Sequence, residues 1–225
     1  MLTLGIETSC DETSIALVSA GREIHANIIL SQTVHTKFGG VVPEIASREH
    51  LKTITPILEE ALEEAGKTLD DIELIAATFG PGLVGPLLVG LSFAKGLAWA
   101  KDIPMVAVNH VEGHLTANIL EHPQLNENHL TLVVSGGHTM LVHVKSFGEY
   151  EILGQTVDDA AGEAFDKVAK VIGLGYPGGA ALDKLAGKGN PDLIRFPRAM
   201  RKDGYKFSFS GLKTAVSMYL DKLPA

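Results

Sequence analysis

Two short turns of this sequence combine small and hydroxyl residues in a way that suits a bound phosphate. Residues 5–13 read Gly-Ile-Glu-Thr-Ser-Cys-Asp-Glu-Thr, and residues 133–139 read Val-Val-Ser-Gly-Gly-His-Thr. Each turn stands between two segments of β-type pattern, where a tight bend lets backbone N–H groups approach an anion closely. Either turn alone is more simply an ordinary hairpin, but their duplication favours a nucleotide site.

Two acidic residues of the first turn, Asp11 and Glu12, do not suit a phosphate because their carboxylates would repel it. They make sense as metal ligands, as groups that orient a water molecule, or as a base acting on an incoming nucleophile. Asp11 and Glu12 are therefore the candidate catalytic residues.

Two histidines with metal-type spacing, His110 and His114, lie between the turns. On an α-helix, residues four apart differ by about 40° around the axis, so both imidazoles can face one metal ion. Glu112 stands about 160° from either histidine, unlike the glutamate of the HExxH zinc peptidases, which weakens a peptidase interpretation. The alternative is a pair that caps or packs at the start of a helix.

A helix expected at residues 159–172 carries Asp166, and a glycine-rich loop follows at residues 173–179. This loop is rich in backbone donors, which suits a ribose or an adenine that lies against the backbone. Asp166 and Asp183 can accept hydrogen bonds from ribose hydroxyls. Taken singly, each aspartate is more simply a solvated or capping residue.

The elements that must position these residues begin with the pattern β-β-β-α-β-α-β. Strands are expected at 2–6, 14–18, 23–30, 72–78 and 105–108, and helices at 47–65 and 83–99. Ser47 is the expected cap of the first helix and Gly66 its expected C′ residue, and Pro56 is expected to kink the helix or delay its start. Its expected buried face is Leu51, Ile54, Leu58, Ala61 and Leu62. The strands at 72–78 and 105–108 read as buried.

The second half opens with a helix at 110–120 and then repeats three strands and a helix. The strands are expected at 130–135, 139–144 and 150–156, and helices at 159–172, 180–186 and 210–220. A hairpin with a small-residue bend, a third strand and a helix therefore occur twice, which indicates an internal duplication. We expect two domains, residues 1–108 and 109–225, the second without a later strand equivalent to 72–78.

Composition narrows the class of protein. The chain has 225 residues, of which 45% are hydrophobic and 20% charged, as is typical of a globular protein. A single cysteine and the lack of a signal-peptide pattern at the start favour a cytoplasmic location. The apolar stretch 83–100 contains Lys95 and glycines, so it predicts a buried helix rather than a membrane span.

The net charge of −8 disfavours a protein with a broad basic face for duplex nucleic acid. One local cluster departs from this balance, and it consists of Arg195, Arg198, Arg201, Lys202 and Lys206. It fits a solvated loop and a contact with an anionic partner such as RNA equally well.

Four segments resemble the tRNA N6-adenosine threonylcarbamoyltransferase family, whose members older descriptions called O-sialoglycoprotein endopeptidase homologues. They are residues 5–13, 110–114, 135–139 and 208–213, the last reading Ser-Phe-Ser-Gly-Leu-Lys. The resemblance covers essentially the whole chain. It implies an α/β fold of the actin-like, Hsp70 and sugar-kinase ATPase type, with two duplicated lobes, the second incomplete here, and a nucleotide cleft between them.

The resemblance also implies an activity, which is transfer of the threonylcarbamoyl group from threonylcarbamoyl-adenylate to N6 of adenosine 37 in tRNAs that read ANN codons. His110 and His114 match the family's metal histidines, and the implied cofactor is one divalent ion per subunit, with iron, zinc and magnesium as candidates. The expected substrate-binding residues are Val133, Val134, Ser135, Gly136, Gly137, His138, Asp166, Gly179 and Asp183.

The partners that the resemblance implies are tRNA, a paralogous actin-like subunit and a small P-loop ATPase, with no membrane. The apolar segment 83–99 is a candidate surface for the paralogue, with plain core as the alternative. The family's chain continues past residue 225, with an asparagine that contacts the nucleotide and an aspartate that completes the metal site. Competing hypotheses are a metallopeptidase, a small-molecule kinase of the same fold, and a non-catalytic scaffold.

Overall fold

The computed structural model describes residues 1–125 and 128–223. The chain divides into two compact units, Met1–Leu120 and Glu121–Ala225. The helix α3 (His110–Glu121) therefore belongs with the first unit, whereas the sequence placed the boundary at residues 108 and 109. Within the described residues, no helix combines the length and the apolar character that a membrane crossing requires.

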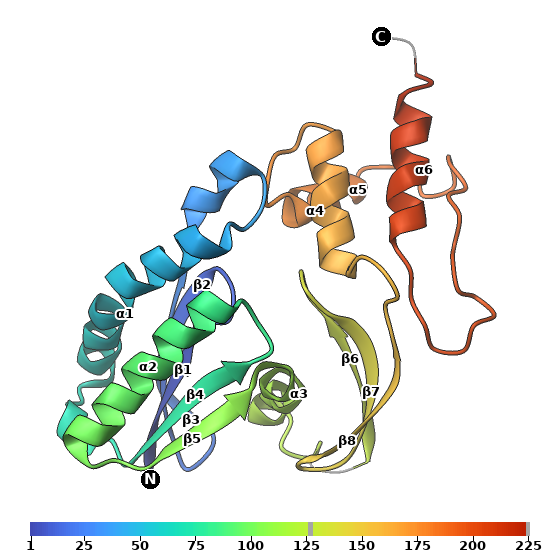
Figure 1. The fold of residues 1–225 in the computed structure, drawn as a ribbon. Helices are drawn as coiled ribbons and strands as arrows, with labels where there is room; N and C mark the ends of the chain where they lie inside the picture. Colours follow the sequence, from blue (N-terminus) through green and yellow to red (C-terminus); the bar gives the residue numbers. More distant parts are fainter. Residues whose placement is uncertain (126–127, 224–225) are drawn as a thin grey trace. The chain divides into compact units, whose positions relative to one another are not determined.

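The first unit is built on a five-stranded mixed sheet in the order β3-β2-β1-β4-β5 (Figure 1). Its strands are β1 (Leu2–Glu7), β2 (Glu12–Ser19), β3 (Glu23–Ser31), β4 (Leu74–Gly80) and β5 (Met105–Asn109). The β1, β2 and β3 strands form an antiparallel meander, while β1, β4 and β5 run parallel. The carboxyl ends of three parallel strands therefore meet at one edge of this sheet.

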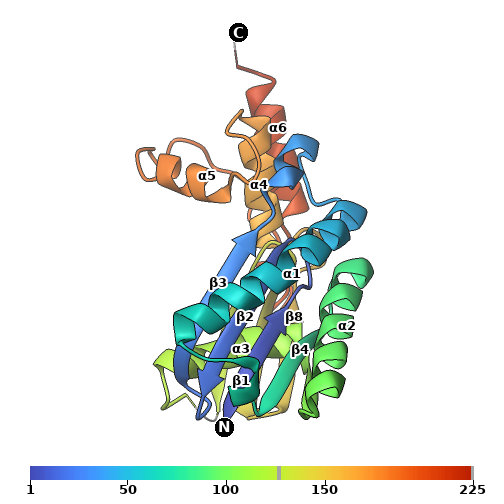
Figure 2. The ribbon, with the colours of Figure 1, turned by 90° about the vertical axis from the view of Figure 1, so that its left-hand side faces the viewer.

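Two helices, α1 (Pro43–Ala65) and α2 (Val84–Lys101), cover one face of this sheet, and α3 lies on its other side (Figures 1 and 2). The core between the helices and the sheet is formed by alternate strand residues, among which Leu4, Ile15, Leu17 and Ile75 are completely buried. The period-2 pattern of β1 and β2 explains this, because successive side chains of a strand point to opposite faces.

The start of α1 differs from the prediction. The helix begins at Pro43, where the missing N–H and fixed φ of proline are favourable, and the Ser47 hydroxyl donates to the Pro43 carbonyl instead of capping a helix start. Pro56 lies inside the helix and does not delay its start. Gly66 ends the helix in the left-handed conformation, as predicted.

The predicted burial was wrong at three places in the first unit. Leu51 on α1 is 66% exposed, while His50 beside it is completely buried. The β5 strand lies at the edge of the sheet and not inside it, and Val106 is exposed. On α2, expected to be a buried helix, Val84, Leu88 and Trp99 are exposed, Trp99 to 90%. Continuous apolar sequence does not tell which face of a helix meets the sheet.

The second unit repeats the opening order of the first. An antiparallel meander of β6 (His129–Val134), β7 (Thr139–Ser146) and β8 (Glu149–Gln155) leads into the helix α4 (Ala161–Val171). The predicted duplication of three strands and a helix is therefore present in the structure. The helices α5 (Gly179–Ala186) and α6 (Ser210–Leu220) pack against α4 (Figure 1). On α4, Ala164 is buried and Val171 is exposed.

Candidate metal and nucleotide site

The parallel strands of the first unit end in a group of polar residues. Glu7 is the last residue of β1, Thr78 lies near the end of β4, and His110 directly follows β5. Ligands of open α/β sheets bind outside the carboxyl ends of the parallel strands. The expected histidine pair therefore stands at the edge of the sheet where a ligand is favoured.

The two histidines face each other at the start of α3. The Asn109 side chain caps this helix, because its Oδ1 accepts the N–H groups of Val111 and Glu112. The Nε2 atoms of His110 and His114 are 3.2 Å apart, and the ring planes are 77° apart. Two nitrogens that share a tetrahedral ion at about 2.0–2.1 Å are separated by roughly 3.3 Å, so the pair fits two adjacent positions of one metal ion.

Glu7 connects this pair to the first turn, and sequence reasoning missed it. Its Oε2 lies 3.1 Å from Nδ1 of His110 and accepts the Thr78 hydroxyl at 2.6 Å, while its Oε1 accepts the N–H of Ser9. Burial alone would raise the pKa of Glu7, but hydrogen bonds from His110, Ser9 and Thr78 outweigh burial and lower the pKa to about 2. The carboxylate is therefore ionised at neutral pH.

The histidine pair is chemically suited to a cation. Burial, followed by the neighbouring His110, lowers the pKa of His114, which keeps its imidazole neutral and its lone pair available. Within residues 1–125 and 128–223, no set of three histidine, cysteine, aspartate or glutamate side chains is arranged to hold a metal ion. The described part of the chain thus offers two candidate ligands, His110 and His114, at this position.

The first turn is held from two sides. On one side, the Thr8 hydroxyl donates to the Pro86 carbonyl, and the Ser9 carbonyl accepts the N–H of Leu83 at 2.8 Å, which fixes the turn against the start of α2. On the other side, His50 from α1 bonds to the Cys10 carbonyl at 3.0 Å. The turn is therefore a rigid support for the residues beside it.

The predicted catalytic carboxylates of the first turn take different places. Glu12 is exposed and accepts the Ser31 hydroxyl across the β2–β3 pair at 2.8 Å. The Asp11 carbonyl accepts the N–H of Gln32 at 2.9 Å. The carboxylate that reaches His110 belongs to Glu7 instead, and a catalytic role for Asp11 or Glu12 stays a prediction.

The second turn is open to solvent at its tip. The Ser135 hydroxyl accepts the N–H groups of Gly137 and His138, and the space beside both Gly136 and Gly137 is empty within 4 Å of an added Cβ. Residues Val133 and Val134 end β6 ahead of this turn, with Val133 buried and Val134 exposed.

The second turn is also attached to a helix start. The Ser135 carbonyl accepts the N–H of Gly162, and Thr139 Oγ1 accepts the N–H of Ala161 at 2.8 Å. Both predicted turns are thus seated against a helix start through a serine carbonyl. The open space beside Gly136 and Gly137 leaves room for an anion to approach the backbone closely.

Of the three predicted substrate-binding residues around the glycine-rich loop, Asp166 and Gly179 are joined by a hydrogen bond. Asp166 Oδ1 accepts the N–H groups of both Gly178 and Gly179, at 2.9 and 2.8 Å, and so caps the start of α5. Asp183 lies exposed on α5. Asp166 therefore orders the end of the glycine-rich loop.

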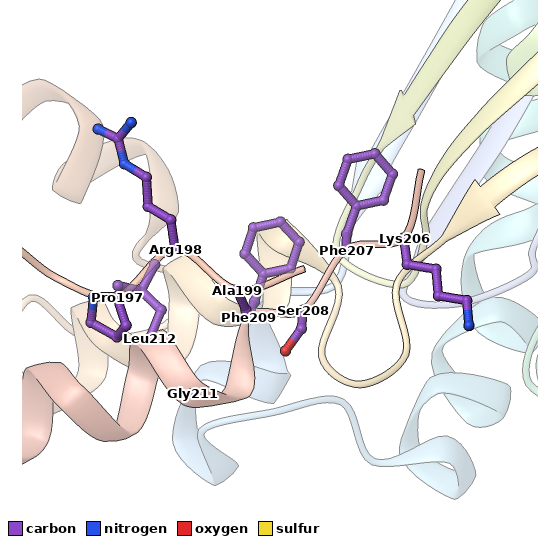
Figure 3. Close-up of a pocket in the computed structure, with 9 residues that line it drawn as sticks. All are labelled: Pro197, Arg198, Ala199, Lys206, Phe207, Ser208, Phe209, Gly211 and Leu212. Carbon is purple, nitrogen blue, oxygen red and sulfur yellow. The ribbon is translucent and has the colours of Figure 1, made fainter. Parts of the chain in front are cut away.

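A hollow of the second unit lies beside the segment that leads into α6. It is lined by Pro197, Arg198, Ala199, Lys206, Phe207, Ser208, Phe209, Gly211 and Leu212 (Figure 3). The Phe207 and Phe209 rings extend to the same side, and the charged ends of Arg198 and Lys206 extend away from each other (Figure 3). Asp158 anchors the segment, because it accepts the Ser208 hydroxyl and the N–H of Phe209.

Comparison with known proteins identifies the family. A model of the tRNA N6-adenosine threonylcarbamoyltransferases matches residues 23–223. The chain belongs to this family. A relative of that name from Clostridium perfringens (strain SM101 / Type A) is 59% identical over 224 residues, which are 99% of this chain and 66% of the relative. The chain thus spans just under two thirds of the length of the family members that it matches.

Solved structures agree on the fold. Component A of the (R)-2-hydroxyglutaryl-CoA dehydratase from Acidaminococcus fermentans has a TM-score of 0.58 at 17% identity and covers 99% of this chain and 69% of its own. The activator of the 2-hydroxyisocaproyl-CoA dehydratase from Clostridium difficile, with bound ADPNP, has a TM-score of 0.55 at 13% identity, over 99% and 66%. The predicted α/β actin-like ATPase fold is confirmed.

Proposed function

We propose that the protein transfers the threonylcarbamoyl group from threonylcarbamoyl-adenylate to N6 of adenosine 37 in tRNAs that read ANN codons. The observation that carries this proposal is the facing His110–His114 pair, 3.2 Å apart, in a chain of the threonylcarbamoyltransferase family. A pair of imidazoles at the carboxyl edge of a parallel sheet is suited to hold a divalent ion beside a substrate phosphate.

The proposed reaction exchanges one bond to the carbamoyl carbon for another. The N6 amine of the adenosine forms a C–N bond to this carbon, the C–O bond to the phosphate breaks, and AMP leaves with the electron pair. The amine loses a proton, for which Asp11 or Glu12 of the first turn is the proposed acceptor. Since the amine is a weak nucleophile, orientation and charge stabilisation supply most of the rate enhancement.

Each proposed site residue has a role in binding. His110 and His114 would hold an iron, zinc or magnesium ion, which supplies positive charge to a carbonyl or phosphate oxygen. The backbone of Gly136 and Gly137, which is open in the structure, would receive the adenylate. The remaining proposed adenylate contacts are Val133, Val134, Ser135, His138, Asp166, Gly179 and Asp183.

The proposed partners are tRNA, a paralogous actin-like subunit and a small P-loop ATPase, all in the cytoplasm. The exposed apolar side chains of α1 and α2, Leu51, Leu88 and Trp99 among them, support a subunit contact on these helices. The cluster Arg195, Arg198, Arg201, Lys202 and Lys206 is exposed throughout, which supports a contact with tRNA.

An assay of nucleosides tests the proposal. The chain, and the chain extended with the C-terminal third of the Clostridium perfringens relative, are incubated with threonylcarbamoyl-adenylate, unmodified tRNA and the partner proteins. The tRNA is digested and its nucleosides are measured by mass spectrometry. We expect threonylcarbamoyl-adenosine from the extended protein and loss of at least 100-fold of the product in a His110→Ala/His114→Ala variant.

The same assay separates the competing functions. Product formation that survives the double histidine variant would contradict the metal role. No product from the extended protein would refute the transferase. Proteolysis that a chelator abolishes would favour a metallopeptidase. ATP-dependent phosphorylation of a metabolite would favour a kinase. Stable complexes with the partners but no turnover would favour a scaffold.

A further inference from the structure

The carboxylate of Glu7 has three hydrogen-bond contacts, each with a different segment of the first unit. Its two oxygens meet the N–H of Ser9, the hydroxyl of Thr78 and Nδ1 of His110, so groups from the first turn, β4 and α3 converge on one carboxylate. Thr78 and Ser9 already join the carboxylate to the sheet and the turn. The contact to His110 is the one that links it to the histidine pair.

The donors at this carboxylate determine where the proton of His110 lies. The two oxygens of Glu7 accept the Ser9 N–H and the Thr78 hydroxyl, so Glu7 acts as the acceptor and Nδ1 of His110 as the donor in their contact at 3.1 Å. In a neutral imidazole with Nδ1 protonated, Nε2 carries the lone pair. This Nε2 is the atom that lies 3.2 Å from Nε2 of His114.

The position of Glu7 is fixed independently of the histidines. Ser9, which donates its N–H to Glu7, is itself held by the bond from Leu83 N–H to its carbonyl at 2.8 Å. The Ser9 hydroxyl also lies 3.2 Å from Nδ1 of His110. The imidazole of His110 is therefore contacted on its Nδ1 side by groups that belong to the rigid first turn.

We infer that Glu7 is a positioning residue, which holds the His110 ring and its Nδ1–H tautomer so that Nε2 is directed at a metal ion shared with His114. A ligand histidine whose other nitrogen donates to a carboxylate is oriented and made more basic by it. This inference rests on the metal role proposed above for the histidine pair.

Metal affinity is the first test, measured on the whole chain. Zn²⁺ alone is titrated into the wild type and into Glu7→Gln, Glu7→Asp and Glu23→Gln variants, with a chromophoric chelator as competitor. We expect Glu7→Gln to bind Zn²⁺ about 10- to 100-fold more weakly and Glu7→Asp to recover part of the loss. Glu23→Gln, which changes an exposed carboxylate bonded to Ser19, should bind like the wild type.

The tautomer of His110 is the second test, and it does not require metal. In the ¹⁵N NMR spectrum of the metal-free wild type, the neutral form of the His110 ring should carry its proton at Nδ1 and not at Nε2. A Glu7→Gln variant should show both tautomers, whereas a purely structural role of Glu7 would leave the tautomer unchanged in a folded variant. Far-UV circular dichroism and unfolding temperature establish that each variant is folded.

The outcomes are distinguishable. Protonation of His110 at Nε2 in the wild type, or unchanged Zn²⁺ affinity of a folded Glu7→Gln variant, would overturn the role of Glu7. Should Glu7→Gln not fold, the wild-type spectrum alone decides. A wild type with the Nδ1–H tautomer but no Zn²⁺ binding would refute the metal site and leave the hydrogen-bond role of Glu7 supported.

Discussion

At the scale of residues, the first turn depends on a completely buried histidine. His50 Nε2 lies 3.0 Å from the Cys10 carbonyl, which can only accept, so Nε2 carries the proton and Nδ1 accepts the Thr13 hydroxyl at 2.7 Å. Burial lowers the pKa of His50, against the opposing effect of the bond to Cys10. The neutral imidazole is thus part of the folded structure.

Because His50 is neutral in the folded chain, the free energy of unfolding should depend on pH. In the unfolded chain His50 gains a proton below about pH 6.5, while in the folded chain it stays neutral to lower pH. Its contribution to stability is therefore fully present above pH 6.5 and is lost as the pH falls, by at most about 1.4 kcal/mol per pH unit. Urea unfolding of the wild type and of His50→Gln between pH 7.5 and 5 should show a stability gap that narrows with falling pH.

The control for this prediction is His122→Gln, which changes an exposed histidine. Its unfolding free energy should stay parallel to that of the wild type over the same range. A gap between the wild type and His50→Gln that stays constant or widens as the pH falls would contradict the neutral buried state of His50.

Residues with a local signature were found from sequence, and residues with only long-range partners were not. The His110–His114 pair was recognisable because four residues make one helical turn. Glu7 was missed because its partners Thr78 and His110 are 71 and 103 residues away. The available signal was that Glu7 is a charged last residue of a strand whose buried face is apolar, at the edge where parallel strands end.

At the scale of elements, the contact between α2 and the first turn depends on glycine. A Cβ on Gly90 would overlap with Oγ1 of Thr8, and a Cβ on Gly82 would overlap with the backbone of Ser9. The helix therefore approaches the turn more closely than any larger residue would allow. Of the glycines in segment 83–100, which argued against a membrane span, Gly90 has this packing role.

Two alanine variants of the same helix test this contact. Gly90→Ala should destabilise the protein by about 1–3 kcal/mol, because the added methyl group must displace Thr8. Gly96→Ala is the matched control, since nothing lies within 4 Å of its added Cβ, and it should be neutral or stabilising by up to about 1 kcal/mol. Equal effects of both substitutions on the urea midpoint would contradict the proposed contact.

Most elements were predictable to within a few residues because their hydrophobic periods are regular, as in β1, β2 and α6. Burial was less predictable than the elements themselves. Val106 and Trp99 belong to apolar segments but lie at a sheet edge and on an outer helix face. Sequence shows that such a segment is apolar, whereas the neighbours in space decide what covers it.

At the scale of the whole molecule, an acidic chain is proposed to bind tRNA through one basic loop. With a net charge of −8, most of the surface repels a nucleic acid, so the affinity should depend on few cations. The unit Glu121–Ala225 contains all five residues of the basic cluster, and all five are exposed.

Salt dependence of tRNA binding tests this loop. An Arg195→Ser/Arg198→Ser/Arg201→Ser variant should reduce the slope of log affinity against log salt by roughly 0.7–0.9 for each arginine that contacts a phosphate. The control, Arg22→Ser/Arg48→Ser/Lys52→Ser, makes the same charge change in the first unit and should keep the slope. Equal loss in the two triple variants, measured by filter binding, would indicate a non-specific charge effect.

The proposed reaction places the threonylcarbamoyl group on one nucleotide of the tRNA. The most direct measurement follows label from threonylcarbamoyl-adenylate, labelled in its carbamoyl carbon, into two tRNAs that read an ANN codon and differ only at position 37. With the extended protein and its partners, we predict label in the tRNA with adenosine 37 and none in the tRNA with guanosine 37. Equal labelling of both tRNAs, or release of AMP without labelled tRNA, would contradict the account.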